Sequence, residues 1–503
     1  MYNILFSGGI TSIEGNVISV ETDVTSGLPY FSMVGLLSSE VKESGERVKS
    51  AIRNSGYYVS PGRITVSLTP GDIRKEGTGF DLAIALGILM SAKVLVLKDE
   101  DMQRLNKTLI LGELGLDGSV KGINGVLPII LKAKLRGFTC CIIPKSNAGE
   151  THMIDGMKIY LVNNLKEAVD AINGNIMPYD NNIEYNKNDG YRFDISNVYG
   201  NDYAKRALLI AVCGMHNILF MGPPGAGKSM LAKCVPSIMP EPDMAERIDI
   251  ASIYSICGLL KDDISFVKRP FRMPHHSITL KAFTGGGSYP KPGELTLAHR
   301  GVLFLDELPE FKSEVLESLR EPLEDRYINI VRNKGTYKFP ADFLLVAAMN
   351  NCKCGYYPDR NLCKCSEVEV SKYLNRVRGP LMDRIDMCIN IPRVNINEIE
   401  AKRGNNSSEL KNIVDKVMNI QQIRFKDLDI RYNSQMNNEQ VKEYCTMTSE
   451  ASNILKLAYD KMHMSVRIYY KIIKVARTIA DIDNSDVINE KHIAEAIGYR
   501  NMI

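Results

Sequence analysis

The sequence predicts an α/β protein of more than one domain, with a three-layered αβα core in its middle part. Three observations support this prediction. The chain has 503 residues, which is too long for one compact core. The glycine-rich segment at residues 222–229 (GPPGAGKS) lies between an apolar, strand-like run and an apolar-periodic, helix-like segment. Residues 302–307 (VLFLDE) form a second apolar strand that ends in two carboxylates. Strand, glycine loop and helix in this order are typical of the start of a nucleotide-binding core.

Strand and helix patterns divide the chain further. Residues 17–20 and 64–68 resemble strands, whereas residues 41–55 and 81–90 resemble helices, so the first part is itself α/β. The last part is helical in its periodicity, and polar stretches separate the parts. We predict the following domains: an N-terminal domain at 1–178, a linker at 179–195, the core at 196–395 and a helical domain at 396–503.

Composition limits the class of protein. Hydrophobic residues make up 45% of the chain and charged residues 24%, as in ordinary globular proteins. No segment approaches the roughly 20 consecutive apolar residues of a membrane helix, and the start lacks the pattern of a signal peptide. Eleven cysteines without an export signal indicate reduced thiols or metal ligands. We therefore expect a cytoplasmic protein without a membrane partner. The net charge of +3 neither supports nor excludes binding to DNA.

The glycine-rich segment fits the P-loop pattern G-x-x-x-x-G-K-[ST] at every fixed position. Its backbone N–H groups would face the β-phosphate of ATP at a helix N-terminus. Lys228 would contact the β- and γ-phosphates, and the Ser229 hydroxyl would ligate Mg²⁺. The predicted nucleotide-binding residues here are Gly222, Pro223, Pro224, Gly225, Ala226, Gly227, Lys228, Ser229 and Met230.

Two further strand ends complete the predicted catalytic set. Asp306 would reach the Mg²⁺ shell, and Glu307 would activate the attacking water as general base. The strand at residues 343–349 ends in Asn350, whose amide can hold the water and sense the γ-phosphate. Taken alone, Asn350 is better explained as a turn-favouring residue at a strand end.

Four cysteines form a C-x-C-x₈-C-x-C cluster directly after that strand: Cys352, Cys354, Cys363 and Cys365. Four thiolates in a reducing compartment suit a tetrahedral, structural Zn²⁺. The spacing within each pair is tighter than the usual C-x₂-C, so four reduced thiols are the alternative. Either way we expect an insertion at residues 352–365.

Two other features of the core are polar. His275 and His276 are adjacent, and because neighbouring side chains diverge, we expect hydrogen bonding rather than a shared metal. Residues 326–338 (RYINIVRNKGTYK) predict a β-hairpin. The hairpin carries Arg326, Arg332, Lys334 and Lys338, which either face a phosphate backbone or form a solvated face.

Beyond the P-loop, several motifs resemble the magnesium-chelatase-like AAA+ ATPases of the YifB/ComM competence-protein family over nearly the whole chain. They include residues 75–82 (KEGTGFDL), 111–114 (LGEL), 274–276 (PHH), 304–311 (FLDELPEF) and 379–386 (GPLMDRID). The resemblance implies a Lon-protease-like N-terminal domain with a ribosomal-S5-like fold, an AAA+ core, a helical lid and a hexameric ring. It also implies branch migration of DNA in recombination during natural transformation, with recombination or replication proteins as partners.

The resemblance assigns further residues. Arg384 is the arginine-finger candidate and Arg378 the second choice, although either can be a structural ion-pair residue. Arg467 resembles the sensor arginine of the lid, and Tyr199 lies in the segment beside the adenine.

The resemblance also raises the question whether the N-terminal domain is a protease. Lon-type cleavage needs a Ser/Lys dyad, but residues 76–81 (EGTGFD) hold no serine and residues 124–131 hold no lysine. We therefore interpret this domain as non-proteolytic. The alternatives to a DNA motor are an ATP-dependent protein remodeller and a chelatase-type regulatory subunit.

Overall fold

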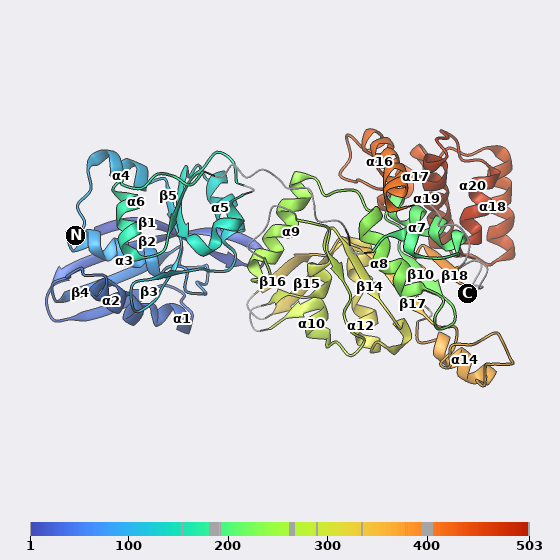
Figure 1. The fold of residues 1–503 in the computed structure, drawn as a ribbon, viewed down its shortest axis with the longest axis horizontal. Coiled ribbons are helices and arrows are strands. Elements are labelled where there is room, and N and C mark those ends of the chain that lie inside the picture. Colours follow the sequence, from blue (N-terminus) through green and yellow to red (C-terminus); the bar gives the residue numbers. More distant parts are fainter. Residues whose placement is uncertain are drawn as a thin grey trace. The chain divides into compact units, whose positions relative to one another are not determined.

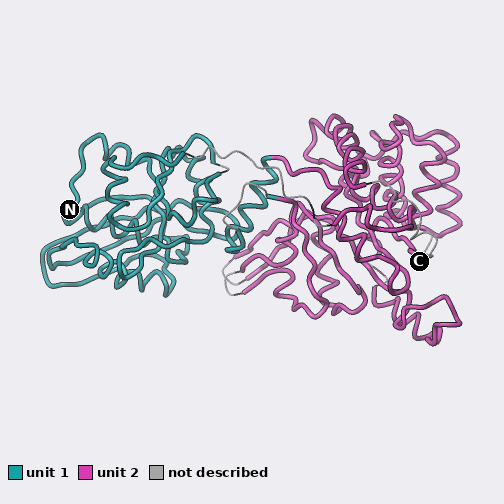
Figure 2. Tube along the Cα trace, in the orientation of Figure 1, with its two compact units in different colours: residues 1–187, 244–267 teal, residues 188–243, 268–503 magenta. Residues whose placement is uncertain are grey.

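The computed structural model describes residues 2–152, 154–180, 191, 193–260, 267–287, 290–332, 335–377, 379, 381–393 and 406–500. The chain divides into two compact units (Figure 2). The first comprises Met1–Lys187 and Met244–Val267, and the second comprises Asn188–Asp243 and Lys268–Ile503. Helix α9 (Met244–Ile256) lies within the core predicted at residues 196–395 but belongs to the first unit.

The first unit is built on a seven-stranded mixed sheet with the order β3-β4-β2-β1-β5-β8-β9 (Figure 1). Helix α3 is buried along its whole length, because its sequence DLAIALGILMS is apolar on almost every side. Helix α9 contacts α5, and the Gly125 N–H donates to the Ser255 carbonyl at 3.1 Å. The elements are β1 (Tyr2–Thr11), β2 (Glu14–Ser26), β3 (Tyr30–Val34), α1 (Ser39–Lys42), α2 (Ser44–Asn54), β4 (Gly62–Thr69), α3 (Asp81–Ser91), α4 (Asp99–Leu105), β5 (Thr108–Ile110), β6 (Glu113–Leu114), β7 (Val120–Lys121), α5 (Val126–Leu135), β8 (Cys140–Pro144), the 3₁₀ helix η1 (Lys145–Thr151), β9 (Lys158–Val162), α6 (Leu165–Ile172) and α9 (Met244–Ile256).

The second unit contains a five-stranded parallel sheet with the order β11-β14-β17-β10-β18. Strands β10, β14 and β17 are buried at every residue, as expected of a parallel sheet covered on both faces. Because the strands are parallel, their carboxyl ends lie along one edge of the sheet. The elements up to that sheet's last strand are η2 (Ile195–Asn197), α7 (Asp202–Gly214), β10 (Ile218–Met221), α8 (Lys228–Ile238), β11 (Phe271–Arg272), α10 (Leu280–Thr284), β12 (Gly285–Gly286), β13 (Lys291–Pro292), α11 (Glu294–Leu297), β14 (Val302–Leu305), η3 (Leu308–Glu310), α12 (Ser313–Ser318), α13 (Arg320–Asp325), β15 (Tyr327–Arg332), β16 (Gly335–Pro340), β17 (Leu344–Met349), α14 (Glu367–Leu374), η4 (Met382–Arg384) and β18 (Met387–Asn390).

Helices follow β18 and share one hydrophobic core with α7, α8 and the sheet. Buried polar contacts join them to α7, since the Gln421 amide donates to the Cys213 carbonyl at 2.8 Å. These elements are α16 (Ser407–Arg424), η5 (Asn433–Gln435), α17 (Asn438–Tyr444), α18 (Ser449–Lys461), α19 (Val466–Ile482) and α20 (Glu490–Gly498).

The mixed α/β class and the hairpin at residues 326–338 are confirmed. Strands β15 and β16 pair antiparallel from Tyr327 opposite Pro340 to Arg332 opposite Gly335. Most of the linker predicted at 179–195 and the boundary predicted at 395/396 lie outside the described residues. Within the described ranges, none of the helices has the length and apolar character needed to cross a membrane.

Candidate nucleotide-binding site

The P-loop joins β10 to α8, as predicted. Gly225 and Gly227 have φ angles of 77° and 86°, a region that side chains with a Cβ rarely adopt. A Cβ added to Gly222 would lie 2.2 Å from the carbonyl oxygen of Ile391, which follows β18. Glycine at residue 222 therefore lets the loop pass close to the neighbouring strand, and Lys228 begins α8 with the first N–H groups of the helix directed back toward the loop.

The Lys228 ammonium lies inside the loop. It donates to the carbonyl oxygens of Gly222 at 2.8 Å and Pro223 at 2.9 Å, and to the amide oxygen of Asn350 at 3.0 Å. Burial lowers the pKa of Lys228 from its ordinary value, and the carboxylate of Asp306 partly opposes this shift. The structure thus brings the predicted lysine and the predicted sensor asparagine into direct contact.

The two carboxylates after β14 have different environments. Asp306 accepts a hydrogen bond from the Ser229 hydroxyl at 2.7 Å, so both predicted Mg²⁺ ligands lie together. Oxygen donors of this kind fit Mg²⁺, and they would leave other coordination positions for water and phosphate. Glu307 has a left-handed backbone with φ 51°, and its side chain is 58% exposed. The Glu307 carboxylate is therefore accessible to the attacking water, as a general base requires.

One histidine approaches the predicted base. The Nδ1 atom of His276 lies 3.6 Å from a carboxylate oxygen of Glu307. The ring centroids of His275 and His276 lie only 4.1 Å apart, with the ring planes tilted by 35°, so the expectation that adjacent side chains diverge is wrong here. These residues lie in a turn between β11 and α10, where neither helical nor strand geometry separates them. The sequence shows that the two histidines are adjacent, but it does not reveal that His276 lies close to Glu307.

The segment predicted beside the adenine contacts the P-loop. Val198 is buried and Tyr199 is 39% exposed. Two residues further on, the Asn201 amide donates to the Ala226 carbonyl at 3.4 Å. The segment is thus adjacent to the nucleotide loop.

The two predicted arginines meet at a residue that sequence reasoning missed. Glu324, at the end of α13, pairs with Arg384 at 2.7 Å and also contacts the Arg467 guanidinium. All three line a cavity of about 700 Å³. Lys228 is not among the described residues that line this cavity. The arginines therefore lie together at one place and Lys228 at another, while Arg378 lies outside the described residues.

Three family models match: "Magnesium chelatase, subunit ChlI" at residues 194–399, "Subunit ChlI of Mg-chelatase" at residues 20–147 and "Magnesium chelatase, subunit ChlI C-terminal" at residues 404–500. The competence protein ComM of Haemophilus influenzae is 38% identical over 99% of this chain and 97% of its own length. The chain belongs to the magnesium-chelatase-like ComM/YifB family. The uncharacterized protein YifB of Escherichia coli is 35% identical over 99% of this chain and 97% of its own length. Lon protease 2 of Bacillus subtilis is 29% identical over 32% of this chain and 30% of its own length. Membership of this AAA+ family indicates an ATPase.

In this family member the four cysteines of the insertion gather at one point. Their sulfur atoms all lie within 4.8 Å of one another, and the Sγ atom of Cys352 lies 3.3 Å from that of Cys354 and 3.7 Å from that of Cys363. Four sulfurs about 2.3 Å from a central Zn²⁺ would be about 3.8 Å apart. The donor set and its spacing therefore fit zinc.

Fewer cations of the hairpin are exposed than its sequence suggested. The Arg326 guanidinium pairs with Asp342 at 2.7 Å, and Lys334 lies outside the described residues. Arg332 and Lys338 are exposed, and the Lys338 ammonium lies 3.8 Å from the centroid of the Tyr327 ring. Of the described cations, these two remain on the outer surface of the hairpin.

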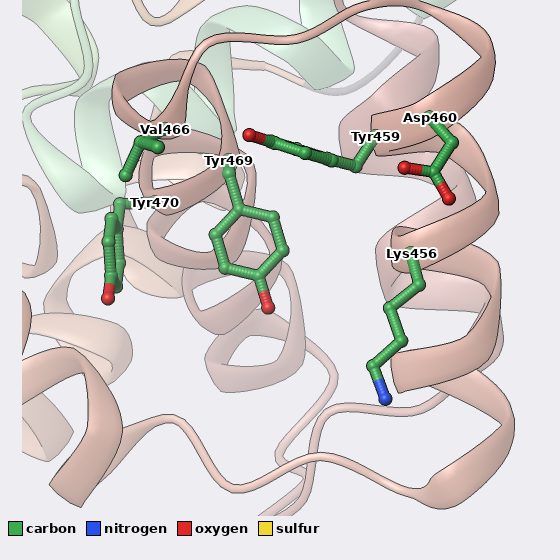
Figure 3. A pocket seen from close by; sticks show the side chains of 6 residues that line it. All are labelled: Lys456, Tyr459, Asp460, Val466, Tyr469 and Tyr470. Atoms are coloured by element: carbon green, nitrogen blue, oxygen red, sulfur yellow. The ribbon is translucent and has the colours of Figure 1, made fainter.

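A second cavity, of about 380 Å³, lies between α18 and α19. Figure 3 shows the Tyr469 side chain between those of Tyr470 and Tyr459, with Lys456 and Asp460 on the facing helix. The tyrosine rings meet edge to face at centroid distances of 5.8 Å and 5.5 Å. Tyr470 lines both cavities, so this aromatic cavity adjoins the one that holds Glu324.

Proposed function

We propose that this chain is an ATP-hydrolysing ring motor that acts on DNA in the cytoplasm, as a branch-migration helicase in recombination and natural transformation. The observation that carries this proposal is the meeting of Lys228, Asn350, Ser229 and Asp306 at the carboxyl edge of the parallel sheet, with Glu307 beside them. The name of the competence protein ComM supports the biological setting. Recombination or replication proteins would be its partners.

Different residues of the site would bind the phosphates, hold Mg²⁺ and activate the attacking water. The P-loop N–H groups and Lys228 would bind the β- and γ-phosphates, and Ser229 and Asp306 would hold Mg²⁺, which supplies charge neutralisation when bound. Glu307 would take a proton from the attacking water, and the Asn350 amide would orient that water toward the γ-phosphate. Tyr199 would lie beside the adenine.

A ring would complete the site. Arg384 and Arg467 share Glu324 in a cavity that Lys228 does not line, which supports delivery of the Arg384 charge to the nucleotide of an adjacent subunit. Arg467 would couple the state of the nucleotide to the angle of the helical lid. A head-to-tail interface between identical subunits closes into a ring when its rotation allows, and we propose a hexamer. Negative charge that develops during phosphoryl transfer would then be stabilised across each interface.

The hairpin is the proposed DNA contact. Arg332 and Lys338 are exposed on a two-stranded hairpin, and exposed cations of this kind can track a phosphate backbone without reading sequence. We expect the affinity for DNA to fall as the salt concentration rises, because each phosphate contact releases a counterion.

The decisive experiment is ATP hydrolysis by purified protein with and without single-stranded or four-way-junction DNA, with Glu307→Gln as the inactive reference. Strong stimulation by DNA that is lost in the double variant Arg332→Ala/Lys338→Ala supports the motor. Lys416→Ala, which removes an exposed cation from α16, is the matched control and keeps the stimulation. Basal hydrolysis that ignores DNA at low salt would contradict the proposal and favour a protein remodeller or a chelatase-type subunit.

We also propose that Cys352, Cys354, Cys363 and Cys365 bind one structural Zn²⁺. Support comes from the sulfur spacing and from the Tyr357 N–H, which donates to the Cys352 sulfur at 3.4 Å, since thiolate ligands accept such hydrogen bonds. One zinc ion per chain in the purified protein tests this assignment.

For the first unit we propose a Lon-protease-like fold without peptidase activity. The segment that would carry the nucleophile is occupied by other contacts: Thr78 donates to the Glu113 carboxylate, and Asp81 pairs with Arg47 at 2.9 Å. Burial raises the pKa of Asp81, and the Arg47 guanidinium opposes this shift. Incubation with an unfolded protein such as casein and ATP should yield no fragments.

A further inference from the structure

The four-cysteine insertion begins at the catalytic site itself. Asn350 bonds to Lys228, and the next residue, Asn351, is buried, with its amide donating to the Tyr357 carbonyl at 3.0 Å. Cys352 follows at once and is fully buried. No spacer therefore separates the proposed sensor from the first cysteine, and a displacement of the cysteine turn would move the asparagine.

The entry limb of the insertion also contacts the P-loop. Gly355 has φ 90°, and a Cβ built on it would lie 2.6 Å from two ring carbons of Pro224. The turn is closed by a hydrogen bond from the Gly355 N–H to the Cys352 carbonyl at 3.0 Å. Glycine is required here because the turn lies directly against the P-loop.

The exit limb returns to the second catalytic motif. Helix α14 begins immediately after Cys365 with a capping box between Ser366 and Glu369. Beyond its end, the Arg376 guanidinium donates to the Pro309 carbonyl at 3.2 Å and lies 3.6 Å from the Glu310 carboxylate. Both belong to η3, the turn that directly follows Glu307.

The cysteines connect these limbs. Cys352 and Cys354 belong to the entry limb, and Cys363 and Cys365 to the exit limb, so a tetrahedral metal would cross-link the two. The limbs also pack in a small buried hydrophobic cluster that joins Cys352, Cys363 and Val370, and the Arg360 guanidinium donates to the Cys365 carbonyl at 2.7 Å. Small metal-centred modules of this kind depend on the metal for their fold.

We propose that the metal-bound insertion fixes the position of the P-loop relative to the turn after Glu307, and we call this insertion, residues 352–365, the brace. ATP hydrolysis by this chain would then depend on metal at the four cysteines. This inference rests on the proposed zinc site and ATPase activity. The brace positions catalytic residues and touches no phosphate. Its loss therefore lowers kcat more than it weakens ATP binding, because binding of phosphate by the P-loop backbone survives.

The test uses the full chain without DNA, so that it is independent of the DNA-motor proposal. Three variants are compared with wild type: Cys363→Ser/Cys365→Ser removes the metal, Arg376→Ala breaks the exit contact and Lys372→Ala is the control on the exposed face of α14. Zinc content, kcat, the affinity for a fluorescent ATP analogue and hydrogen exchange of the P-loop are measured for each.

The brace predicts that the cysteine variant loses its zinc and at least about tenfold in kcat, with less than about threefold change in affinity. Arg376→Ala keeps zinc and loses roughly three- to tenfold in kcat, and P-loop exchange quickens in both variants. Lys372→Ala behaves as wild type.

If the wild type contains zinc but kcat and P-loop exchange are unchanged in both variants, the brace is overturned and the zinc site stands. Wild-type protein without zinc would overturn the metal-dependent brace together with the zinc site. An inactive wild type would contradict the ATPase proposal, and P-loop exchange would still decide for or against the brace.

Discussion

The amide oxygen of Asn350 accepts a hydrogen bond from the Lys228 ammonium at 3.0 Å. The two residues are 122 positions apart. Asn350 directly follows β17, and Lys228 begins α8 after the loop that follows β10, the strand that pairs in parallel with β17. The same lysine also donates to two P-loop carbonyls. A γ-phosphate held by Lys228 would therefore lie within reach of Asn350, which is the geometry that a phosphate sensor needs.

Replacing Asn350 with Ala should lower kcat for ATP roughly 10- to 100-fold, because one positioned amide is lost from the transition state. The affinity for ATP should change little, since Lys228 keeps its P-loop contacts. Steady-state hydrolysis and equilibrium binding of a fluorescent ATP analogue measure the two quantities. Lys228→Ala is the contrasting variant and should abolish binding. Equal losses in affinity and kcat in Asn350→Ala would contradict a sensor.

Arg384 should act on the nucleotide of the neighbouring subunit. Arg384→Ala should lower kcat about 100-fold or more, as arginine fingers do. A mixture of Arg384→Ala and Lys228→Ala subunits should regain activity, because roughly a quarter of the head-to-tail interfaces then combine an intact P-loop with an intact arginine. Activity is measured before and after mixing, with mixtures of Glu307→Gln and Lys228→Ala as the control that cannot recover. A mixture that stays inactive, although size measurements show that its subunits have assembled together, would contradict action from the neighbour.

Local motifs account for the site residues that the structure brings together. The P-loop, Asp306 and Asn350 each follow an apolar strand, and parallel strands deliver their carboxyl ends to one edge. The contacts of Glu324 were not predictable in this way. It is 60 residues from Arg384 in an exposed part of α13, and no short pattern marks a carboxylate that will meet two arginines after folding.

Two other features depend on long-range packing. Helix α9 lies within the core region of the sequence yet packs in the first unit, which periodicity alone does not reveal. The cysteine spacing predicted a metal site, but the contact of Gly355 with Pro224 arises only when β10 and β17 pair. The spacing of cysteines in the sequence indicates which ion they can bind. The residues that contact the cysteine cluster are determined by the tertiary fold.

His276 should position the proposed general base. The imidazole is held between His275 and Phe311 and faces the Glu307 carboxylate at 3.6 Å. His276→Ala should lower kcat roughly three- to tenfold without changing the affinity for ATP, because the free carboxylate samples more orientations. His276→Gln keeps a donor and should restore most of the activity, and His275→Ala is the neighbouring control. An unchanged kcat in His276→Ala would mean that the contact does not orient Glu307.

Acid should destabilise the second unit through His216. This histidine is fully buried after α7, and its Nε2 atom lies 2.8 Å from the Thr478 hydroxyl of α19. Burial lowers its pKa from 6.5 to about 4, while Asp386 opposes and Lys471 and Lys474 reinforce that shift. The unfolded chain therefore binds more protons than the folded chain between these values, so stability is fully present above pH 6.5 and is lost as the pH falls toward 4. The loss between pH 7 and pH 5 should be about 2 kcal/mol in the free energy of unfolding.

Urea unfolding at both pH values, for wild type and for His216→Gln, measures this loss of stability. The His216→Gln variant keeps a hydrogen-bonding side chain but cannot titrate, so its pH dependence should be weaker by this amount. His463→Gln, at an exposed residue that follows α18, should retain the wild-type dependence. Equal pH dependence in all three proteins would show that the charge of His216 does not contribute to the acid sensitivity of the fold.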